Sequence, residues 1–295
     1  MKKCFGLVVL ALSVVLFSCQ DDNGGTQPGG EEFSEKSAQI AMDEVAMESA
    51  TTELDYEVDF YANAELVLSG WAGMGKHWGW SNGLRYKYNH CPNLNIESED
   101  GGYPKTITLD YGDSTVLRSG KVLSGVIVIE ISGPRSDENY TRLVTYGNFG
   151  VDSLLINGTA QVTADREEDV SRTFTSDVTF TLADGTTVER TSVREWEWIE
   201  GMDTELEQTD DMLQITGYSN AVNSTGDEYK KEIVEPLIRV RDCRFIVQGV
   251  VEITLNGELV SSLDYGDGDC NDVAVLTQDG ETVEVDLSIR KCRFK

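Results

Sequence analysis

The sequence predicts a mainly β protein, an antiparallel β-meander or sandwich that is built from two related units and follows one N-terminal helix. Three observations support this class. Runs in which apolar and polar residues alternate follow one another from Leu84 to Ile289. Asn-Gly and Asp-Gly dipeptides stand between several of the runs, and the pentapeptide Leu-Asp-Tyr-Gly-Asp occurs twice. A period of two is the pattern of a half-buried strand, and these dipeptides are strong signals of a short hairpin.

The predicted strands include residues 106–110, 122–131, 173–182 and 245–255. Two-residue hairpin turns are predicted at Asn157-Gly158, Asp184-Gly185, Asn256-Gly257 and Asp279-Gly280. Strands joined by such short turns pair with their neighbours in sequence, which predicts an antiparallel meander.

The repeated pentapeptide occupies residues 109–113 and 263–267, and each copy follows a cysteine, Cys91 or Cys243. We interpret this as two related β units, about 84–160 and 230–295, inside one β body of residues 65–295.

Residues 33–64 are predicted to form a helix. Apolar residues recur there at roughly helical spacing among Glu, Ala and Asp, without glycine or proline. Ser34 is the expected N-cap. We expect this helix to pack on the sheet or to act as a spacer.

Residues 1–18 are a predicted signal peptide. Lys2 and Lys3 precede an apolar run over residues 5–17, which is shorter than the ~20 residues that a helix needs to span a bilayer. The run ends in Leu16-Phe17-Ser18-Cys19, which resembles the lipobox of bacterial lipoproteins. The resemblance implies cleavage before Cys19 and a diacylglycerol and a fatty acid on that cysteine, an anchor that holds the protein in a membrane. The alternative is a plain secretory signal with a chance cysteine.

Residues 19–32 are predicted to be the lipid anchor and a flexible tether, because they contain four glycines and a proline and almost no apolar side chains. Asp21 and Asp22 resemble the export signal that takes Bacteroidota lipoproteins to the outer cell surface; the alternative is ordinary linker acidity. We therefore expect the protein in the cell envelope, anchored in the outer membrane, either on the cell surface or on the periplasmic face.

The chain is strongly acidic, with 24 Lys and Arg against 52 Asp and Glu, a net charge of −28. Removal of Lys2 and Lys3 with the signal peptide leaves 22 basic residues and a net charge of −30. A phosphate backbone is bound by clustered Lys and Arg, so nucleic acid is excluded as a predicted partner.

Four cysteines besides Cys19 remain in the mature chain, and they allow three complete pairings. A two-residue turn at Asn256-Gly257 sets Cys243 directly opposite Cys270, at a separation that a disulfide can bridge. The turn at Asp279-Gly280 sets Cys292 opposite Asp267, close enough to compete. We predict the Cys243–Cys270 disulfide, which leaves Cys91 either free or paired with Cys292.

Residues 68–82 are rich in glycine and tryptophan and have no period of either kind, which predicts an irregular loop. Trp71, Trp78 and Trp80 are the candidate ligand-binding residues, since an aromatic platform suits a sugar ring or another flat ligand. The alternative is packing in the core.

Residues 264–272 carry a high density of oxygen-bearing side chains, which suits Ca²⁺. Read as an EF-hand loop from Asp267, the segment has Asp272 where glycine is needed and Gln278 where the bidentate glutamate belongs, so that motif fails. The alternatives are an irregular calcium loop and a plain solvated turn. The candidate ligands are Asp264, Asp267, Asp269 and Asn271. No other cofactor is predicted.

The lipobox, the acidic tether, the repeated pentapeptide and the segments Arg241-Asp-Cys-Arg-Phe245 and Val251-Glu-Ile-Thr-Leu-Asn-Gly257 together resemble a group of uncharacterised Bacteroidota lipoproteins. The resemblance covers nearly the whole mature chain. It implies location and fold and carries no activity. The chain departs from the group after Asp113, where a cysteine is missing.

The sequence contains no Gly-x-Ser-x-Gly elbow and no phosphate-cradling glycine loop. We expect a non-catalytic binding module for a glycan or an envelope protein. The alternatives are a glycan-active hydrolase with unidentified carboxylates and a calcium-stabilised structural protein of the envelope. With 52 acids in the chain, no catalytic pair can be nominated from sequence.

Overall fold

The computed structural model describes residues 30–72, 92–117, 120–135, 137–164, 171–201, 210–243 and 245–287. The predicted signal peptide, Cys19, Cys91, Cys292 and most of the tether lie outside these residues. The predicted class is confirmed: the described chain is mainly antiparallel β-sheet with one N-terminal helix.

The helix α1 (Gly30–Ala72) has 43 residues, which makes it about 65 Å long at 1.5 Å per residue. It contains the predicted helix 33–64 and extends beyond both of its ends. The predicted N-cap at Ser34 is therefore wrong, and so is the prediction of an irregular loop for residues 68–72. No glycine or proline occurs between Glu31 and Ser69, so nothing in the local sequence stops the helix before the segment around Gly70.

The strands form one 14-stranded antiparallel sheet, in which consecutive strands are neighbours and β3 pairs with β4 beside the main path. A short 3₁₀ helix, η1 (Glu99–Gly101), separates β1 from β2. The first half of the sheet consists of β1 (Asn93–Ser98), β2 (Lys105–Asp110), β3 (Thr115–Val116), β4 (Val122–Ile131), β5 (Thr141–Val151), β6 (Leu154–Ala164) and β7 (Ser171–Thr181). The second half consists of β8 (Thr187–Glu200), β9 (Met212–Asn223), β10 (Glu228–Val240), β11 (Ile246–Leu255), β12 (Glu258–Asp267), β13 (Val273–Gln278) and β14 (Glu281–Asp286).

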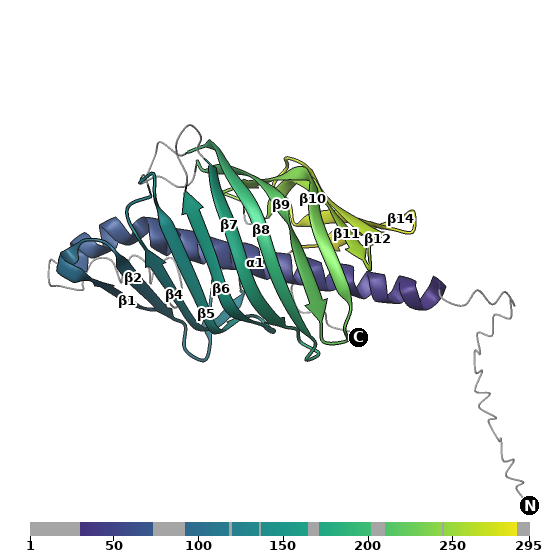
Figure 1. The fold of residues 1–295 in the computed structure, drawn as a ribbon, viewed down its shortest axis with the longest axis horizontal. Coiled ribbons are helices and arrows are strands. Elements are labelled where there is room, and N and C mark those ends of the chain that lie inside the picture. Colours follow the sequence, from purple (N-terminus) through teal and green to yellow (C-terminus); the bar gives the residue numbers. More distant parts are fainter. Residues whose placement is uncertain are drawn as a thin grey trace, which may run out of the picture.

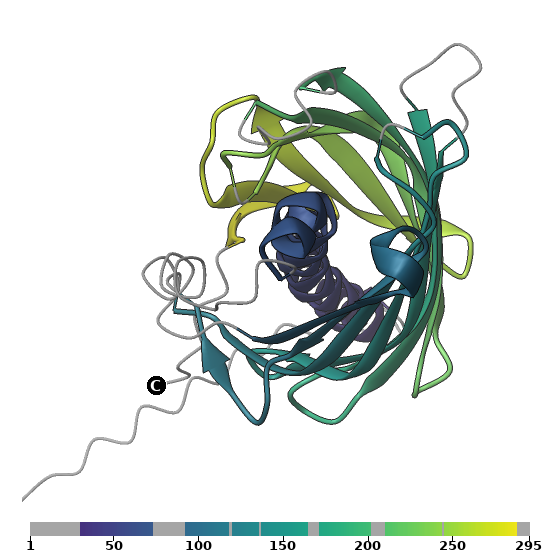
Figure 2. The same ribbon diagram turned by 90° about the vertical axis from the view of Figure 1, so that its left-hand side faces the viewer.

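The sheet curls around the helix, so that α1 runs along the inside of a deep trough (Figures 1 and 2). The strands with the two free edges, β1 and β14, lie on either side of the opening. Alternate residues of each strand face inward, and they form one core with buried apolar residues of α1 such as Ile40, Leu54 and Val58. The helix therefore occupies the place that a second sheet takes in other two-layer β proteins.

Two predicted hairpin turns have the predicted length: Leu255 pairs with Glu258 around Asn256-Gly257, and Gln278 pairs with Glu281 around Asp279-Gly280. Asp184-Gly185 lies in the connection between β7 and β8, but the predicted two-residue length is wrong, because Thr181 pairs with Thr187 and five residues lie between them. The prediction at Asn157-Gly158 is wrong, because both residues lie inside β6. Gly158 is required there by close packing: at its φ of +128°, a Cβ atom would lie 2.2 Å from the Asp177 carbonyl oxygen of β7.

The two copies of the repeated pentapeptide share one local hydrogen bond, although residues 111–113 follow β2 whereas residues 265–267 belong to β12. The side chain of Asp110 accepts a 2.8 Å hydrogen bond from the Gly112 amide, and Asp264 accepts one of the same length from Gly266. The tyrosine that follows each aspartate, Tyr111 or Tyr265, is buried. One copy ends β2, near the first edge of the sheet, and the other ends β12, near the last edge.

The predicted disulfide between Cys243 and Cys270 is confirmed, with 5.7 Å between the two α-carbons. Its bridge joins the segment after β10 to the segment after β12. Two irregularities shift the register between β11 and β12, so the cysteines do not occupy directly opposed ladder positions. They still lie within bridging distance because each falls just beyond the end of its strand.

Candidate functional site

The inner side of the helix is acidic where a core helix is ordinarily apolar. Glu44, Glu48, Asp55 and Asp59 are spaced by four, seven and four residues, which places them along one face of the helix. All four are buried, with at most 8% of the residue surface exposed. Ionised carboxylates are rarely buried without partners, so this face requires cations from the sheet.

The sheet supplies those cations from inward-facing strand positions. Arg190 and Arg194 lie four residues apart on β8, so the alternation of the strand directs both side chains to the same face. Lys231 and Arg239 come from β10, and Arg142 comes from β5. All of these cations are buried. We name the helix acids and the strand cations together the ionic seam.

The first cluster of the ionic seam surrounds Glu44 and Glu48. The guanidinium of Arg194 donates two hydrogen bonds to Glu48, at 3.3 and 3.1 Å. Lys231 lies 3.2 Å from Glu44 and also donates to Glu48, and Arg190 lies 3.4 Å from Glu44. Burial alone would raise the pKa of Glu48, but the charges of Arg194, Lys231 and Arg190 outweigh it and hold that pKa well below its usual range.

The second cluster surrounds Asp55 and Asp59, two to three helical turns further along. Asp59 accepts hydrogen bonds from Arg142 at 2.7 Å, from Arg239 at 3.0 Å and from Arg241 at 3.3 Å. Burial would raise the pKa of Asp59, yet these three guanidinium groups lower it far below its usual range. Asp55 has one ion-pair partner, Arg239 at 3.2 Å, and burial together with the charge of Asp59 raises its pKa to about 6.

The helix also joins the two edges of the sheet. The hydroxyl of Ser49 donates to the carbonyl oxygen of Leu287, just after β14, and receives a 3.3 Å hydrogen bond from Lys121, just before β4. Lys121 lies 3.5 Å from Glu53, and Tyr111 donates a 2.6 Å hydrogen bond to Glu57. The contacts on both sides of the trough opening are thus made through α1.

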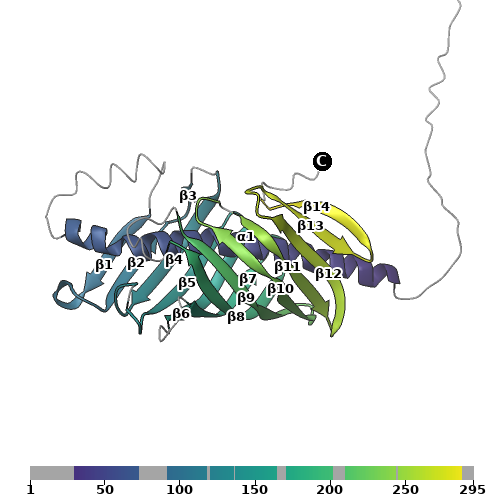
Figure 3. The same ribbon diagram turned by 90° about the horizontal axis from the view of Figure 1, so that it is seen from above.

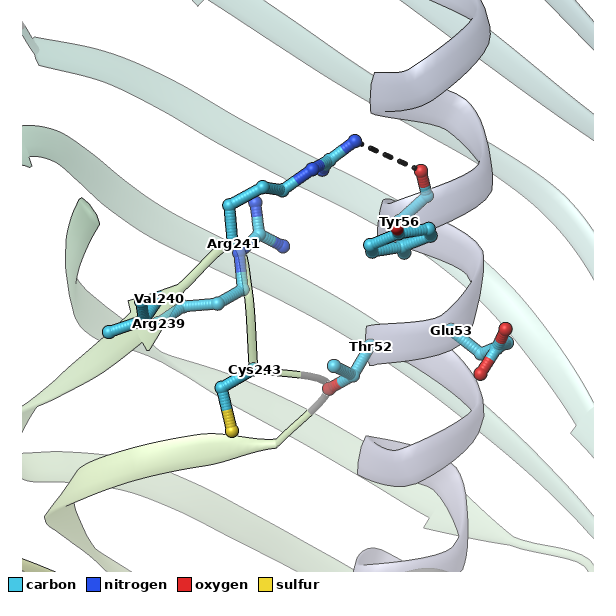
Figure 4. A pocket seen from close by; sticks show the side chains of 7 residues that line it. All are labelled: Thr52, Glu53, Tyr56, Arg239, Val240, Arg241 and Cys243. Atoms are coloured by element: carbon cyan, nitrogen blue, oxygen red, sulfur yellow. Dashed lines mark hydrogen bonds between the residues drawn. The ribbon is translucent and has the colours of Figure 1, made fainter. Parts of the chain in front are cut away.

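Two small pockets flank the ionic seam. The first lies between the helix and the segment after β10, where Arg241 reaches across to the Tyr56 carbonyl and the Tyr56 ring (Figure 4). The second lies between the helix and the strands β6 to β8, beside Asp55 and Arg190. The free space in them is about 10 and 20 Å³, which is room for about one water molecule each. Beside the ionic seam, these two pockets therefore leave no room for a ligand larger than water.

The predicted ligand-binding tryptophans lie at the end of α1 and beyond it. Trp78 and Trp80 fall outside the described residues, and Trp71 belongs to the last turn of α1, where only the backbone is described. The two other tryptophans pack against the core: Trp196 is buried and stacks on Phe174 with ring centroids 4.9 Å apart. Trp198 packs against the same core.

The predicted calcium ligands lie in and after the end of β12. Asp264 directs its carboxylate to the Gly266 amide, and Asn271 accepts a 2.9 Å hydrogen bond from the Val273 amide. Asp267 and Asp269 are exposed beside them. Within the residues that the structure describes, no three His, Cys, Asp or Glu side chains gather closely enough to hold a metal ion. The side-chain oxygens of Asp264 and Asn271 thus accept hydrogen bonds from backbone amides of the same segment.

The ionic seam itself was not predicted, although its signal is present in the sequence. Within 33–64, the four acids Glu44, Glu48, Asp55 and Asp59 follow helical spacing as regularly as the apolar residues do. On the strand side, arginine replaces an apolar residue at the inward positions 190 and 194 of an alternating run. Matching stripes of opposite charge on a helix and a strand are the pattern that could have revealed the contact.

Comparison of the chain with protein-family models, with curated proteins and with solved structures finds no match. Among the described residues, no helix has both the length and the apolar character needed to cross a bilayer.

Proposed function

We propose that the protein is a lipid-anchored, non-catalytic binding module of the cell envelope, held in the outer membrane through Cys19. Its ligand is a glycan or an envelope protein that contacts the segment around Trp71, Trp78 and Trp80. We also propose that it belongs with the uncharacterised Bacteroidota lipoproteins that its sequence resembles.

The observation that carries this proposal is the course of α1. The helix begins at Gly30, within the predicted tether, and ends at Ala72, directly before the remainder of the tryptophan-rich segment. About 65 Å of continuous helix therefore lies between the predicted tether and the part of that segment that follows Ala72. The ionic seam fixes the helix to the sheet along its middle, so the two ends cannot approach each other without breaking buried ion pairs.

This geometry suits presentation of a ligand-binding segment away from a membrane. The buried charges pair with one another between the helix and the sheet, and they hold the helix against the sheet. A rigid support holds a binding segment in place, which lowers the entropy lost on binding.

The anchor is tested with Cys19→Ser, with Cys4→Ser in the signal peptide as the matched control. We expect the unaltered protein and Cys4→Ser to incorporate radiolabelled palmitate and to stay in the membrane fraction after a carbonate wash. Cys19→Ser loses both properties, because a single cysteine carries the lipid. Retention of Cys19→Ser in washed membranes would refute the anchor.

Ligand binding is tested with the unlipidated Cys19→Ser protein on a glycan array and in a polysaccharide pull-down. The variant Trp71→Ala/Trp78→Ala/Trp80→Ala is expected to lose binding with an unchanged melting temperature. Tyr218→Ala is the matched control, because Tyr218 is an exposed aromatic residue of the sheet and is 40% accessible. Binding that survives the triple substitution, or that Tyr218→Ala abolishes, places the ligand elsewhere.

One observation favours a second candidate, a glycan-active hydrolase. The environment pushes the pKa values of Asp55 and Asp59 in opposite directions, which is how a carboxylate pair divides acid and base roles. Against it, both carboxylates are buried, and the pocket that Asp55 lines holds about one water molecule. Release of reducing sugar from an envelope polysaccharide that is lost in Asp55→Asn would establish this candidate.

A further inference from the structure

The last hairpin of the sheet, β13–β14, forms one wall of a groove of about 530 Å³ beside the helix. Ala38 and Met42 of α1 form the opposite wall. Two large apolar side chains are exposed there: Met42 is 44% and Val283 is 58% accessible. None of the residues that line this groove belongs to the ionic seam.

Among the described strands, β14 is the edge strand at this groove, since β13 is the one strand that pairs with it (Figure 3). The turn residues Asp279 and Gly280 have φ values of +53° and +81°, which is the conformation of a two-residue hairpin. In such a hairpin the flanking residues, Gln278 and Glu281, form a hydrogen-bonded pair. From Glu281 onward, every second residue of β14 then forms its backbone hydrogen bonds with β13. The 2.7 Å hydrogen bond from the Leu287 amide to Asp272 fits this alternation.

The backbone amide and carbonyl groups of Thr282 and Glu284 therefore point away from β13, toward the open edge. Among the described strands, none lies on this side of β14 to pair with them. Outward-pointing groups of this kind are the template to which an additional strand can bind.

The charge around this edge has one sign. Residues 273–286 contain Asp279, Glu281, Glu284 and Asp286 and no lysine or arginine. Of the groove-lining residues, Asp279 and Glu281 are acidic and none is basic. A second copy of the same acidic edge would be repelled, whereas a basic segment would be attracted.

We propose that β14 binds an extended basic peptide segment of a partner protein as an additional strand. The segment has alternating apolar and basic residues. Its apolar side chains lie on the inner face of the sheet, against Met42 and Val283, and its basic side chains lie on the outer face, near Glu284. Backbone hydrogen bonds to Thr282 and Glu284 hold it in register.

The test uses the full mature chain with Cys19→Ser and three fluorescein-labelled octapeptides: alternating Val and Lys, alternating Val and Glu, and alternating Gly and Lys. Fluorescence anisotropy at physiological salt measures binding. We expect the Val-Lys peptide to bind at least tenfold more tightly than either of the others. The Gly-Lys peptide has the same charge without the strand propensity, so equal binding of the two lysine peptides overturns the proposal.

The decisive variant is Thr282→Pro, which removes one outward amide without changing the charge or the β13–β14 pairing. Thr282→Val is its matched control. We expect Thr282→Pro to weaken Val-Lys binding at least tenfold with an unchanged melting temperature, and Thr282→Val to leave it unchanged. Glu284→Arg is also expected to weaken Val-Lys binding, because it replaces an acidic side chain near the peptide lysines with a basic one. Binding that is indifferent to both Thr282→Pro and Glu284→Arg overturns the proposal.

Two other occupants of the edge would show themselves in the same experiment. If the peptide binds only after the chain is truncated behind Leu287, the chain's own C-terminal segment occupies the edge. If the protein is a dimer that Thr282→Pro converts to a monomer, a second copy occupies it. Either result overturns the proposal of a basic partner.

Discussion

At the scale of single residues, the protein places ionised carboxylates inside its core and neutralises each with cations from the sheet. Asp59 has three guanidinium partners, and Asp55 has one. A buried ion pair contributes little net stability, because desolvation offsets the Coulomb attraction. Removing one member, however, leaves a buried charge without a partner, and that is costly.

We predict that Asp59→Asn destabilises the protein by about 3–5 kcal/mol at pH 7, because Arg142, Arg239 and Arg241 lose their shared counter-charge. Asp55→Asn should cost much less, since ionised Asp55 is already unfavourable at pH 7. Urea unfolding of both variants measures the difference, with the exposed Asp269→Asn as control. Equal losses for Asp55→Asn and Asp59→Asn would contradict the pairing.

The pKa values of the helix acids predict a stability maximum on the acid side of neutrality. Burial raises the pKa values of Asp43 and Asp55 from 3.8 to about 6, so between about pH 6 and 4 the folded state binds protons that the unfolded chain does not. Stability therefore rises as the pH falls from 7 to about 5. The pKa values of Glu48 and Asp59 are lowered, so below about pH 4 the unfolded chain takes up their protons first and stability is lost.

Chemical denaturation at a series of pH values checks this profile. The rise between pH 7 and 5 should be smaller in Asp55→Asn, because the variant has no carboxyl group to protonate at that position. A rise of the same size in the variant would show that Asp55 is not its source.

At the scale of elements, the sequence allowed prediction of features that depend on local chemistry. The helix, the strand alternation, the turns at Asn256-Gly257 and Asp279-Gly280 and the Cys243–Cys270 disulfide all follow from neighbouring residues. The turn predicted at Asn157-Gly158 is wrong because Gly158 is required by a close contact with β7, which the local sequence does not reveal. The ionic seam was missed for the same reason: pairs such as Glu48–Arg194 join residues 146 positions apart.

The disulfide gives a prediction at this scale. It closes a loop with a sequence separation of 27 residues, for which the chain-entropy estimate is about 3–4 kcal/mol of stabilisation. The variant Cys243→Ser/Cys270→Ser should lose roughly that amount in urea unfolding, and reduction of the unaltered protein should produce the same loss. An unchanged unfolding midpoint in the variant would show that the bridge contributes no stability.

At the scale of the whole molecule, the sheet and the helix depend on each other. The sheet curls around α1, and contacts across its opening run through Ser49 and Glu53 of the helix (Figure 2). Tyr111 of the first pentapeptide copy donates a hydrogen bond to Glu57 of the helix. Tyr265 of the second copy is buried in the core, and burial first and then the charge of Glu48 raise its pKa. The repeat thus lies near both edges of the sheet, and its first copy is bonded to the helix through Tyr111.

The central claim is that paired charges fix the helix inside the sheet, and a double-mutant cycle on Glu48 and Arg194 tests it most directly. The free energies of unfolding of Glu48→Gln, Arg194→Met and the double variant are compared with that of the unaltered protein. We predict a coupling energy of about 2–3 kcal/mol, because each single substitution leaves a buried charge without its bidentate partner. If the two single losses simply add, these charges do not hold the helix, and the account is contradicted.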